Sequence, residues 1–175
     1  MRHGPAEDHA ASGRDFDRAL TASGRERVRD VARALVVGGE APLVILTSPL
    51  VRALQTAEIV AGVVQLAQEA DERGGDAASV EIRRDLSPDG DCEAFALKTI
   101  EGQGKRVMLV GHEPILGELA ARLSGRAFPA GLQKAMVVGL GTHKDEPSRL
   151  PLRLRFVLDP KSLEWLHDGR RHGRT

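Results

Sequence analysis

Residues 43–57, LVILTSPLVRALQTA, carry the clearest indication of the fold class. The first part, Leu43 to Leu46, is a short aliphatic run of the kind found in strands that are buried on both faces. Ser48-Pro49 interrupts this run and opens a helix. The apolar residues that follow share one face of that helix: Leu50, Ala53, Leu54, Ala57, Val60, Ala61 and Val64. A buried strand that leads directly into a helix is the repeating unit of α/β proteins.

The same order of strand and helix recurs along the chain. Residues 107–110 predict a second buried strand, and a helix is expected from about Pro114. An earlier helix follows Thr21, which suits an N-cap, and ends at Gly38-Gly39. The apolar stripes of these two helices are Val28, Val31, Ala32 and Leu35, and Leu116, Leu119, Ala120 and Leu123. This alternation predicts an α/β three-layer sandwich with a mostly parallel central sheet flanked by helices.

Shorter elements complete the predicted fold. They are a strand at 80–82, a turn at 87–90, a helix to about Thr99, strands at 135–140 and 152–158, and a helix from Lys161. We expect one domain over 1–168 and a basic, disordered tail at 169–175.

The composition excludes several classes of function. The 175 residues include 25 basic and 25 acidic ones, so no overall basic field favours nucleic acid. Aromatic residues make up 3% and tyrosine is absent, which disfavours a stacking surface for single strands. No apolar run is long enough to span a membrane, and Cys92 has no partner for a disulfide. A cytoplasmic monomer is expected.

Residues suited to anion binding follow both predicted strands. Arg52 comes after the first strand and His112 after the second, while Arg2-His3-Gly4 lies near the beginning of the chain. Ligands of open α/β sheets bind beyond the carboxyl ends of the strands, where helix N-termini also favour negative charge. Since guanidinium groups match phosphate oxygens in pairs, these residues predict a phosphate site.

The motifs around these residues resemble those of the histidine phosphatase superfamily. Arg2-His3-Gly4 is similar to its signature, residues 48–57 (SPLVRALQTA) to its second motif, and residues 110–114 (VGHEP) to its second-histidine motif. The segments 18–24, 86–91 and 154–160 resemble the short SixA-type phosphohistidine phosphatases in particular. The resemblance covers nearly the whole chain, in the order that the family shows, and implies the family's α/β fold.

The resemblance implies a role for each motif residue. His3 would be the nucleophile that forms a phosphohistidine intermediate, and Arg2, Arg52 and His112 would hold and stabilise the phosphoryl group. Gly4 would allow the backbone to approach the ligand. No cofactor is implied. We expect no metal either, because the other histidines, His9, His143, His167 and His172, have no ligand spacing.

Nearby residues have structural interpretations that compete with a functional one. Ser48 is expected to cap a helix near the site, and Glu113 to favour the dipole of the helix that follows it. Arg18 is expected to be structural or to belong to a lid.

Two features depart from the family pattern. A strand normally precedes the Arg-His-Gly segment, and here only Met1 does; we therefore expect either an in-frame β-rich run upstream of Met1 or the loss of a central strand. Many relatives also carry an acidic general acid, which the SixA type does without. No motif selects one from the candidates Asp85, Asp89, Asp91 and Glu93.

The preferred function is removal of phosphate from phosphohistidine on a signalling protein. The alternatives are a small-molecule phosphomonoesterase of broad specificity and a non-catalytic phosphate-binding protein. Phosphoglycerate mutase is disfavoured because the tyrosine-containing stretch of those enzymes is missing. The short segment 65–105, which would leave the site accessible, favours a protein-borne substrate.

Overall fold

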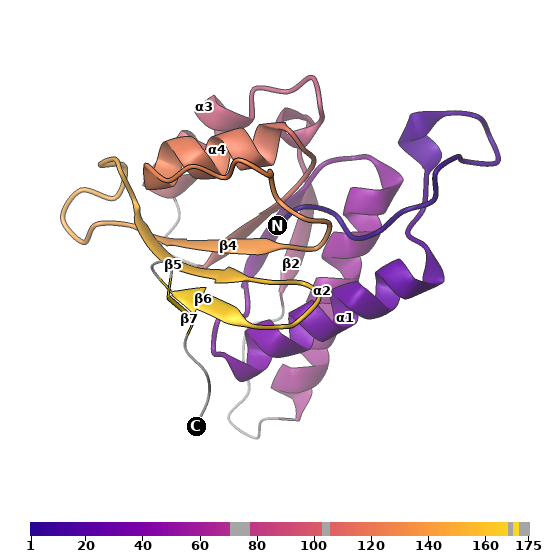
Figure 1. Cartoon of the computed structure of the whole chain (residues 1–175), viewed down its shortest axis with the longest axis horizontal. Helices are drawn as coiled ribbons and strands as arrows, with labels where there is room; N and C mark the ends of the chain where they lie inside the picture. The colour runs from indigo at the N-terminus through magenta and orange to yellow at the C-terminus, as the bar shows by residue number, and fades with distance from the viewer. Residues whose placement is uncertain (71–77, 103–105, 168–169, 172–175) are drawn as a thin grey trace.

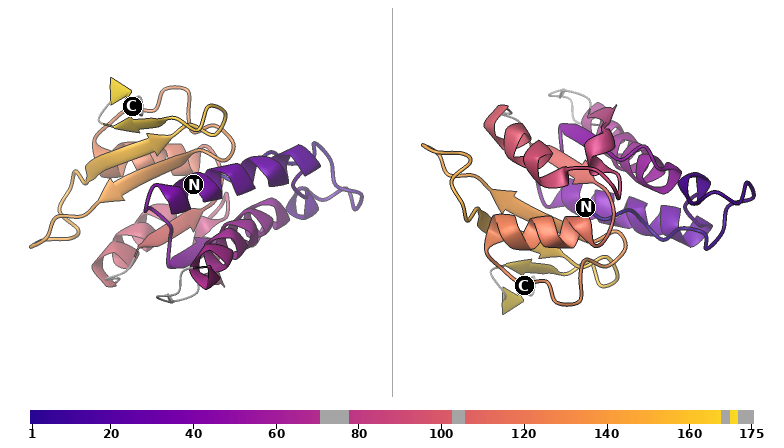
Figure 2. Two further views of the ribbon diagram at one scale, coloured as in Figure 1. Left: turned by 90° about the horizontal axis from the view of Figure 1, so that it is seen from below. Right: turned by 90° about the horizontal axis from the view of Figure 1, so that it is seen from above.

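Two sheets form the middle layer of the molecule, and helices cover both of its faces (Figure 1). The computed structural model describes residues 1–70, 78–102, 106–167 and 170–171. Helices α1 (Ala22–Val37) and α2 (Val51–Glu69) lie on one side of the strands, and α3 (Cys92–Gly102) and α4 (Ile115–Ser124) lie on the other (Figures 1 and 2). The three-layer α/β arrangement predicted from the sequence is confirmed.

The first sheet is parallel. Its central strand, β1 (Val44–Thr47), pairs with β2 (Ser79–Ile82) and with β3 (Val107–Val110). Side chains alternate between the faces: Ile45 enters the core under α1 and α2, whereas Leu46 enters the core under α3 and α4. Burial on both faces explains why Val44, Ile45 and Leu46 of β1 are all apolar.

The second sheet is antiparallel, in the order β4 (Val137–Gly141), β5 (Arg153–Leu158), β6 (Trp165–His167) and β7 (Arg170–Arg171). The expected parallel pairing therefore holds for the first sheet only. Parallel neighbours need a long crossover, usually helical, and none of the described segments between these strands forms a helix.

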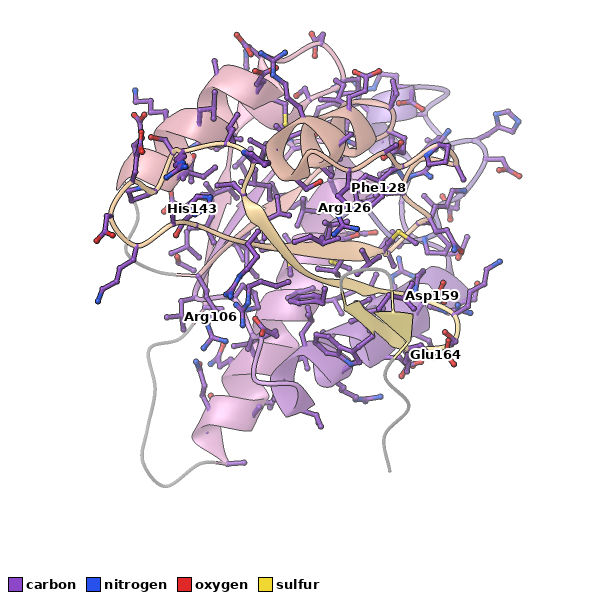
Figure 3. The ribbon with its side chains drawn as sticks, turned by 60° about the vertical axis from the view of Figure 1, so that its left-hand side comes forward. Arg106, Arg126, Phe128, His143, Asp159 and Glu164 are labelled. Carbon is purple, nitrogen blue, oxygen red and sulfur yellow. The ribbon has the colours of Figure 1, made fainter. Side chains whose placement is uncertain are left out.

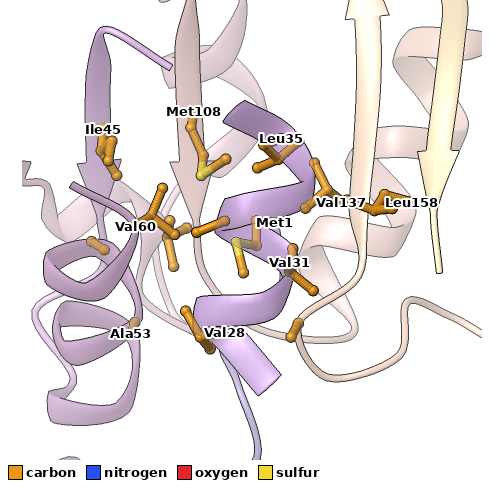
Figure 4. Packing of buried hydrophobic residues seen from close by; sticks show 14 of the residues in the cluster. Met1, Val28, Val31, Leu35, Ile45, Ala53, Val60, Met108, Val137 and Leu158 are labelled. Atoms are coloured by element: carbon orange, nitrogen blue, oxygen red, sulfur yellow. The ribbon is translucent and has the colours of Figure 1, made fainter. Parts of the chain in front are cut away.

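The N-terminal segment joins the two sheets. Arg2 forms a parallel bridge with Gly111, and the His3 N–H donates to the Gly111 carbonyl at 3.0 Å. On its other side, the Arg2 N–H donates to the Met136 carbonyl at 3.1 Å. The Met1 side chain belongs to the buried cluster that also contains Val31 (Figure 4). Residues 1–3 therefore lie between β3 and the beginning of β4, with their backbone held from both sides.

The helix expected from Lys161 is wrong, because the chain turns there and forms β6. The Asp159 carboxylate accepts hydrogen bonds from the N–H groups of Lys161 and Ser162, at 2.8 and 2.9 Å. The Asp159 N–H donates to the Glu164 carbonyl, which closes the turn that Figure 3 shows. Trp165 then packs against Phe156 of β5, with the ring centroids 4.6 Å apart.

Helix α1 begins and ends where the sequence predicted. Thr21 caps α1, since its side chain accepts a hydrogen bond from the Gly24 N–H, and Gly38 follows the last residue of the helix. Of the expected tail 169–175, only Arg170 and Arg171 lie within the described residues, and their backbone pairs with β6.

Gly139→Ala should destabilise the fold by about 1–3 kcal/mol. A Cβ atom on Gly139 would overlap the ring of Phe156, which is itself held by Trp165. Thermal and urea denaturation would measure the loss. Gly62→Ala is the matched control, because nothing lies within 4 Å of a Cβ there and a helical alanine should add about 0.5–1 kcal/mol. Equal stability of the two variants would contradict the packing described here.

Candidate active site

The site lies where three neighbouring segments end. β1 ends at Thr47 and is followed by Ser48, and β3 ends at Val110 and is followed by Gly111 and His112. Thr47 and Val110 are register partners, and the His3 backbone pairs with Gly111. This register brings residues 3, 48 and 112 to one edge of the first sheet. The sequence predicted this convergence at the carboxyl ends of the strands.

His3 is buried and its tautomer is fixed by its neighbour. Its side chain Nδ1 lies 2.7 Å from the Gly4 carbonyl oxygen, which can only accept a hydrogen bond. Nδ1 therefore carries the proton, and Nε2 has a free lone pair. Burial lowers the pKa of His3 to about 3, and the positive charges of Arg52 and Arg2 act in the same direction. The imidazole is thus neutral at pH 7.

His112 faces His3, with the ring centroids 5.2 Å apart and the planes inclined by 51°. Its Nε2 is hydrogen-bonded to Ser48 Oγ at 2.9 Å. Burial lowers its pKa to about 4; the charge of Arg52 lowers it further, and the carboxylate of Asp15 partly opposes the shift. Like His3, His112 is a neutral imidazole at pH 7.

Arg52 lies in the first turn of α2 and is buried. Its guanidinium donates to the Asp15 carbonyl at 2.8 Å and to the Asp15 carboxylate at 3.0 Å. One turn later, the Thr56 hydroxyl donates to the Arg52 carbonyl and accepts from the Gly4 N–H. Because Thr56 contacts both segments, it fixes the position of the His3-Gly4 segment relative to α2.

Arg2 is held through the backbone of a distant loop. Its Nη1 donates to the Leu132 carbonyl at 2.6 Å. The Glu113 carboxylate occupies space next to Gly117 and Gly131, where a Cβ atom would lie 2.7 and 2.5 Å from its Oε2. Burial raises the pKa of Glu113, whereas the Leu132 N–H and the charge of Arg2 lower it. Arg2 and Glu113 are thus both hydrogen-bonded to the backbone of Leu132, which the expected role of Glu113 beside the helix dipole did not include.

Several buried nitrogens in this region have no hydrogen-bond partner among the described residues. Nε of Arg2, Nε of Arg52 and Nδ1 of His112 make no hydrogen bond with any described residue. Buried polar groups normally have partners, and an oxyanion would supply acceptors for the two guanidinium nitrogens and for Nδ1 of His112 in the tautomer that carries its proton there. This donor set fits a phosphoryl group.

Gly4 and Ser48 make contacts that the sequence did not predict. Gly4 was expected to let the backbone approach the ligand; a Cβ there would lie 2.6 Å from Val28 Cγ2, so the packing of α1 also requires a glycine at this position. Its N–H is engaged by Thr56. Ser48 does not cap α2, which begins at Val51 with Leu50 as its N-cap; its hydroxyl contacts His112.

Asp15 is the residue of the site that sequence analysis missed. It lies in the short 3-10 helix η1 (Asp15–Asp17) and binds both Arg52 and Arg18, the latter at 3.2 Å. The hydrogen bond and charge of Arg52 hold the pKa of this carboxyl below its usual range, against the opposing effect of burial. The only signal in the sequence was an acid three residues before Arg18, in a loop without periodicity.

The four candidate general acids separate into two pairs. Asp91 accepts a hydrogen bond from the Ala94 N–H at the beginning of α3, and Glu93 pairs with Arg122 at 2.6 Å. Asp85 and Asp89 line a cavity beside Ser87. Within the described residues, none of the four is hydrogen-bonded to His3 or His112.

Neither a metal centre nor a membrane span is present in the described part of the chain. No three His, Cys, Asp or Glu side chains within residues 1–70, 78–102, 106–167 and 170–171 form a group suited to a metal ion. His172 lies outside the described residues. No helix there is long and apolar enough to cross a bilayer.

Asp15→Asn should strengthen the binding of oxyanions. The Asp15 carboxylate engages the guanidinium of Arg52, so an incoming anion must compete with it. We expect the Kd for vanadate to fall by about 3–10-fold, measured by calorimetry. Asp17→Asn is the control, because Asp17 pairs with Arg14 and Ser12 instead. Weaker binding by Asp15→Asn would show that the carboxylate positions Arg52 and does not compete.

The stability of the chain should fall as the pH drops from 7 to about 4.5. The folded pKa values of about 3 for His3 and about 4 for His112 lie below the usual 6.5. In this window the unfolded chain binds more protons, so the free energy of unfolding decreases with falling pH, by roughly 2 kcal/mol per histidine. Urea denaturation at several pH values measures the slope. His3→Gln should remove about half of it, and an unchanged slope would contradict the neutral, buried state of His3.

Comparisons with known proteins identify the family. The model of the histidine phosphatase superfamily (branch 1) matches residues 1–74. An uncharacterized protein of Picosynechococcus is 38% identical over 146 residues, which are 80% of this chain and 81% of the relative. The structure of the protein histidine phosphatase SixA complexed with tungstate is similar, with a TM-score of 0.74, 25% identity and coverage of 94% of this chain and 97% of that one.

A mycobacterial glucosyl-3-phosphoglycerate phosphatase has the same fold, with a TM-score of 0.59 and 17% identity over 87% of this chain and 93% of that one. The chain belongs to the histidine phosphatase superfamily and is of its SixA type. It is accordingly a phosphatase.

Proposed function

We propose that the chain removes the phosphoryl group from phosphohistidine on a protein, by transferring it to His3 and then to water. The observation that carries this proposal is the hydrogen bond from His3 Nδ1 to the Gly4 carbonyl. Because this bond keeps the proton on Nδ1, the lone pair of Nε2 is available at neutral pH. A neutral imidazole beside two guanidinium groups is suited to attack phosphorus.

The reaction consists of two in-line displacements. In the first, Nε2 of His3 forms a bond to phosphorus while the bond from phosphorus to the substrate nitrogen breaks. In the second, water attacks phosphorus, the bond to Nε2 breaks, and the product leaves as dihydrogen phosphate, which carries both protons of the attacking water. Since Nδ1 of His3 remains protonated, Nε2 leaves as part of a neutral imidazole.

The surrounding cations stabilise the charge on the transferring group. Arg52 and Arg2 would bind its equatorial oxygens through nitrogens that have no partner in the described structure, and Nδ1 of His112 would donate a third hydrogen bond. Ser48 supports this role, because its hydroxyl holds the opposite nitrogen of His112.

The leaving group favours phosphohistidine over alkyl phosphates. A phosphorylated imidazole that carries a proton on its other nitrogen departs as a neutral ring, whereas an alkoxide must be protonated as it leaves. No carboxylic acid is hydrogen-bonded to either histidine of the described site. Between α2 and β3 the described residues form only β2, the 3-10 helix η2 (Arg84–Leu86) and α3, which is consistent with an accessible site.

Competing substrates test the proposal. We would measure kcat/KM for a phosphohistidine peptide, a nitrophenyl phosphate and glycerol phosphate, each with and without a chelator. The peptide should be the best substrate and the alkyl ester the poorest, by about 10²-fold or more. Turnover of glycerol phosphate that exceeds that of the peptide would overturn the proposal. Loss of activity on adding the chelator would point to a metal enzyme instead.

A small-molecule phosphomonoesterase is the second candidate, since a mycobacterial glucosyl-3-phosphoglycerate phosphatase shares the fold. The same comparison of substrates distinguishes it, because it predicts efficient turnover of alkyl phosphates. A non-catalytic phosphate-binding protein would bind vanadate and hydrolyse none of the three.

A further inference from the structure

A cavity of about 500 Å³ adjoins the phosphate site. One part of its wall is apolar and consists of Phe16, Pro49 and Leu50. The other part comes from the segment between β2 and α3, namely Arg84, Asp85, Ser87, Asp89 and Gly90. The cavity is large enough for an extended side chain together with part of its backbone, and the phosphate chemistry proposed above does not use it.

Residues that line the cavity lie one or two positions in the sequence from residues of the phosphate site. Phe16 follows Asp15, which binds Arg52, and Pro49 follows Ser48, which binds His112. In the polar part of the wall, Ser87 follows Leu86. The carbonyl oxygen of Leu86 would lie 3.2 Å from a Cβ atom on Gly111, the residue before His112. A group in the cavity would therefore lie beside a phosphoryl group at His3.

The polar wall is held in one conformation by its own backbone. η2 is followed by a turn in which the Gly90 N–H donates to the Ser87 carbonyl at 2.9 Å. A Cβ atom on Gly90 would overlap the carbonyl oxygens of Arg84 and Asp85, so only glycine allows this approach. The carboxylates of Asp85 and Asp89 are thus presented on a fixed frame.

The charges of the wall favour a basic ligand. Asp85 and Asp89 form no ion pair within the described residues, and both are exposed. Arg84 is the one cation in the lining, so the wall carries two negative charges and one positive charge. Phe16 is 46% exposed and offers an aromatic face beside them. An aromatic face near carboxylates suits a guanidinium group, which can stack on the ring and bind a carboxylate with two N–H groups.

We propose that this cavity binds an arginine side chain of the substrate protein, located near the phosphohistidine in its sequence or on its surface. The proposal rests on the proposed function, because it requires a protein substrate. The aliphatic stem of the arginine would pack on Leu50 and Phe16, and its guanidinium would bind Asp85 and Asp89. The cavity would thereby select among phosphohistidine proteins, while residues 2, 3, 52 and 112 carry out the chemistry.

Position-scanned peptides test this selection. Each peptide carries one phosphohistidine, and a single arginine, lysine or glutamate replaces alanine at one position within four residues on either side. We expect kcat/KM to rise about tenfold for arginine at a preferred position, less for lysine, and not at all for glutamate. The gain should appear mainly in KM, because the arginine contacts no reacting atom.

Variants of the wall assign the preference to the cavity. Asp85→Asn combined with Asp89→Asn should reduce the ratio between the arginine and alanine peptides to about 1, and Phe16→Ala should reduce it several-fold. Asp145→Asn is the control, since this exposed acid lies on the loop between β4 and β5, which projects from the end of the molecule opposite residues 5–19 (Figure 2). It should leave the ratio unchanged.

The outcomes separate the two proposals. If all peptides are hydrolysed with no preference for arginine, or if the preference survives in the double variant, the cavity does not bind arginine and the proposed function stands. If only the nitrophenyl ester is hydrolysed, the proposed function fails and the arginine site fails with it. A preference that is lost in the double variant and kept in Asp145→Asn supports both.

Discussion

His3→Ala should reduce kcat for every phosphate substrate by at least about 10⁴-fold. The substitution removes the imidazole whose Nε2 is left unprotonated because its Nδ1 is hydrogen-bonded to the Gly4 carbonyl. No second nucleophile replaces it, because Nε2 of His112 is engaged by Ser48. Steady-state assays with nitrophenyl phosphate and with a phosphohistidine peptide would measure the loss.

The interpretation of this result needs two controls. His9→Ala changes an exposed histidine in the same N-terminal region and should keep full activity. Binding of vanadate to His3→Ala, measured by calorimetry, would show that the variant is folded with its phosphate site intact. If His3→Ala bound vanadate and retained more than roughly a tenth of the activity, His3 could not be the nucleophile.

Arg52→Ala should reduce kcat by about 10²–10³-fold. The guanidinium is buried beside both histidines, and its charge contributes to the lowered pKa of each. Its loss removes donors to the transferring phosphoryl group, which carries more negative charge on its oxygens as the reaction proceeds. Vanadate should also bind more weakly to this variant.

Arg52→Lys separates charge from geometry. Lysine keeps the positive charge but cannot bind two oxygens with a planar fork, so we expect an activity between those of Arg52→Ala and the unmodified chain. Arg33→Ala, which removes an exposed arginine paired with Asp30 on α1, should have no effect on activity. Full activity of Arg52→Ala would show that Arg52 serves only to bind Asp15.

The parts of the fold that sequence analysis predicted correctly depend on local patterns. β1 and β3 are continuous aliphatic runs, and α1 and α4 carry apolar stripes at helical spacing with recognisable ends. The register of parallel strands then determines which residues meet. This is why His3, Arg52 and His112 could be expected at one place although they are far apart in the sequence.

The features that were missed depend on contacts between distant segments. The helix expected from Lys161 does not form, because the chain there turns back and pairs with β5 as an antiparallel strand. In this strand, Trp165 packs on Phe156. Asp15 reaches Arg52 only because residues 5–19 fold back over the beginning of α2. In the same way, Gly4 accommodates Val28 of α1, a neighbour that no short motif could reveal.

Trapping of the covalent intermediate would show whether His3 is the nucleophile. The chain would be mixed with a labelled phosphohistidine peptide, quenched within milliseconds and digested with trypsin, which yields the peptide 3–14. Because this peptide also contains His9, fragmentation is needed to assign the label. We predict an acid-labile, base-stable phosphate on His3. Label on His9 or on another residue, or turnover with no labelled peptide under conditions that retain phosphohistidine, would show that His3 is not the nucleophile.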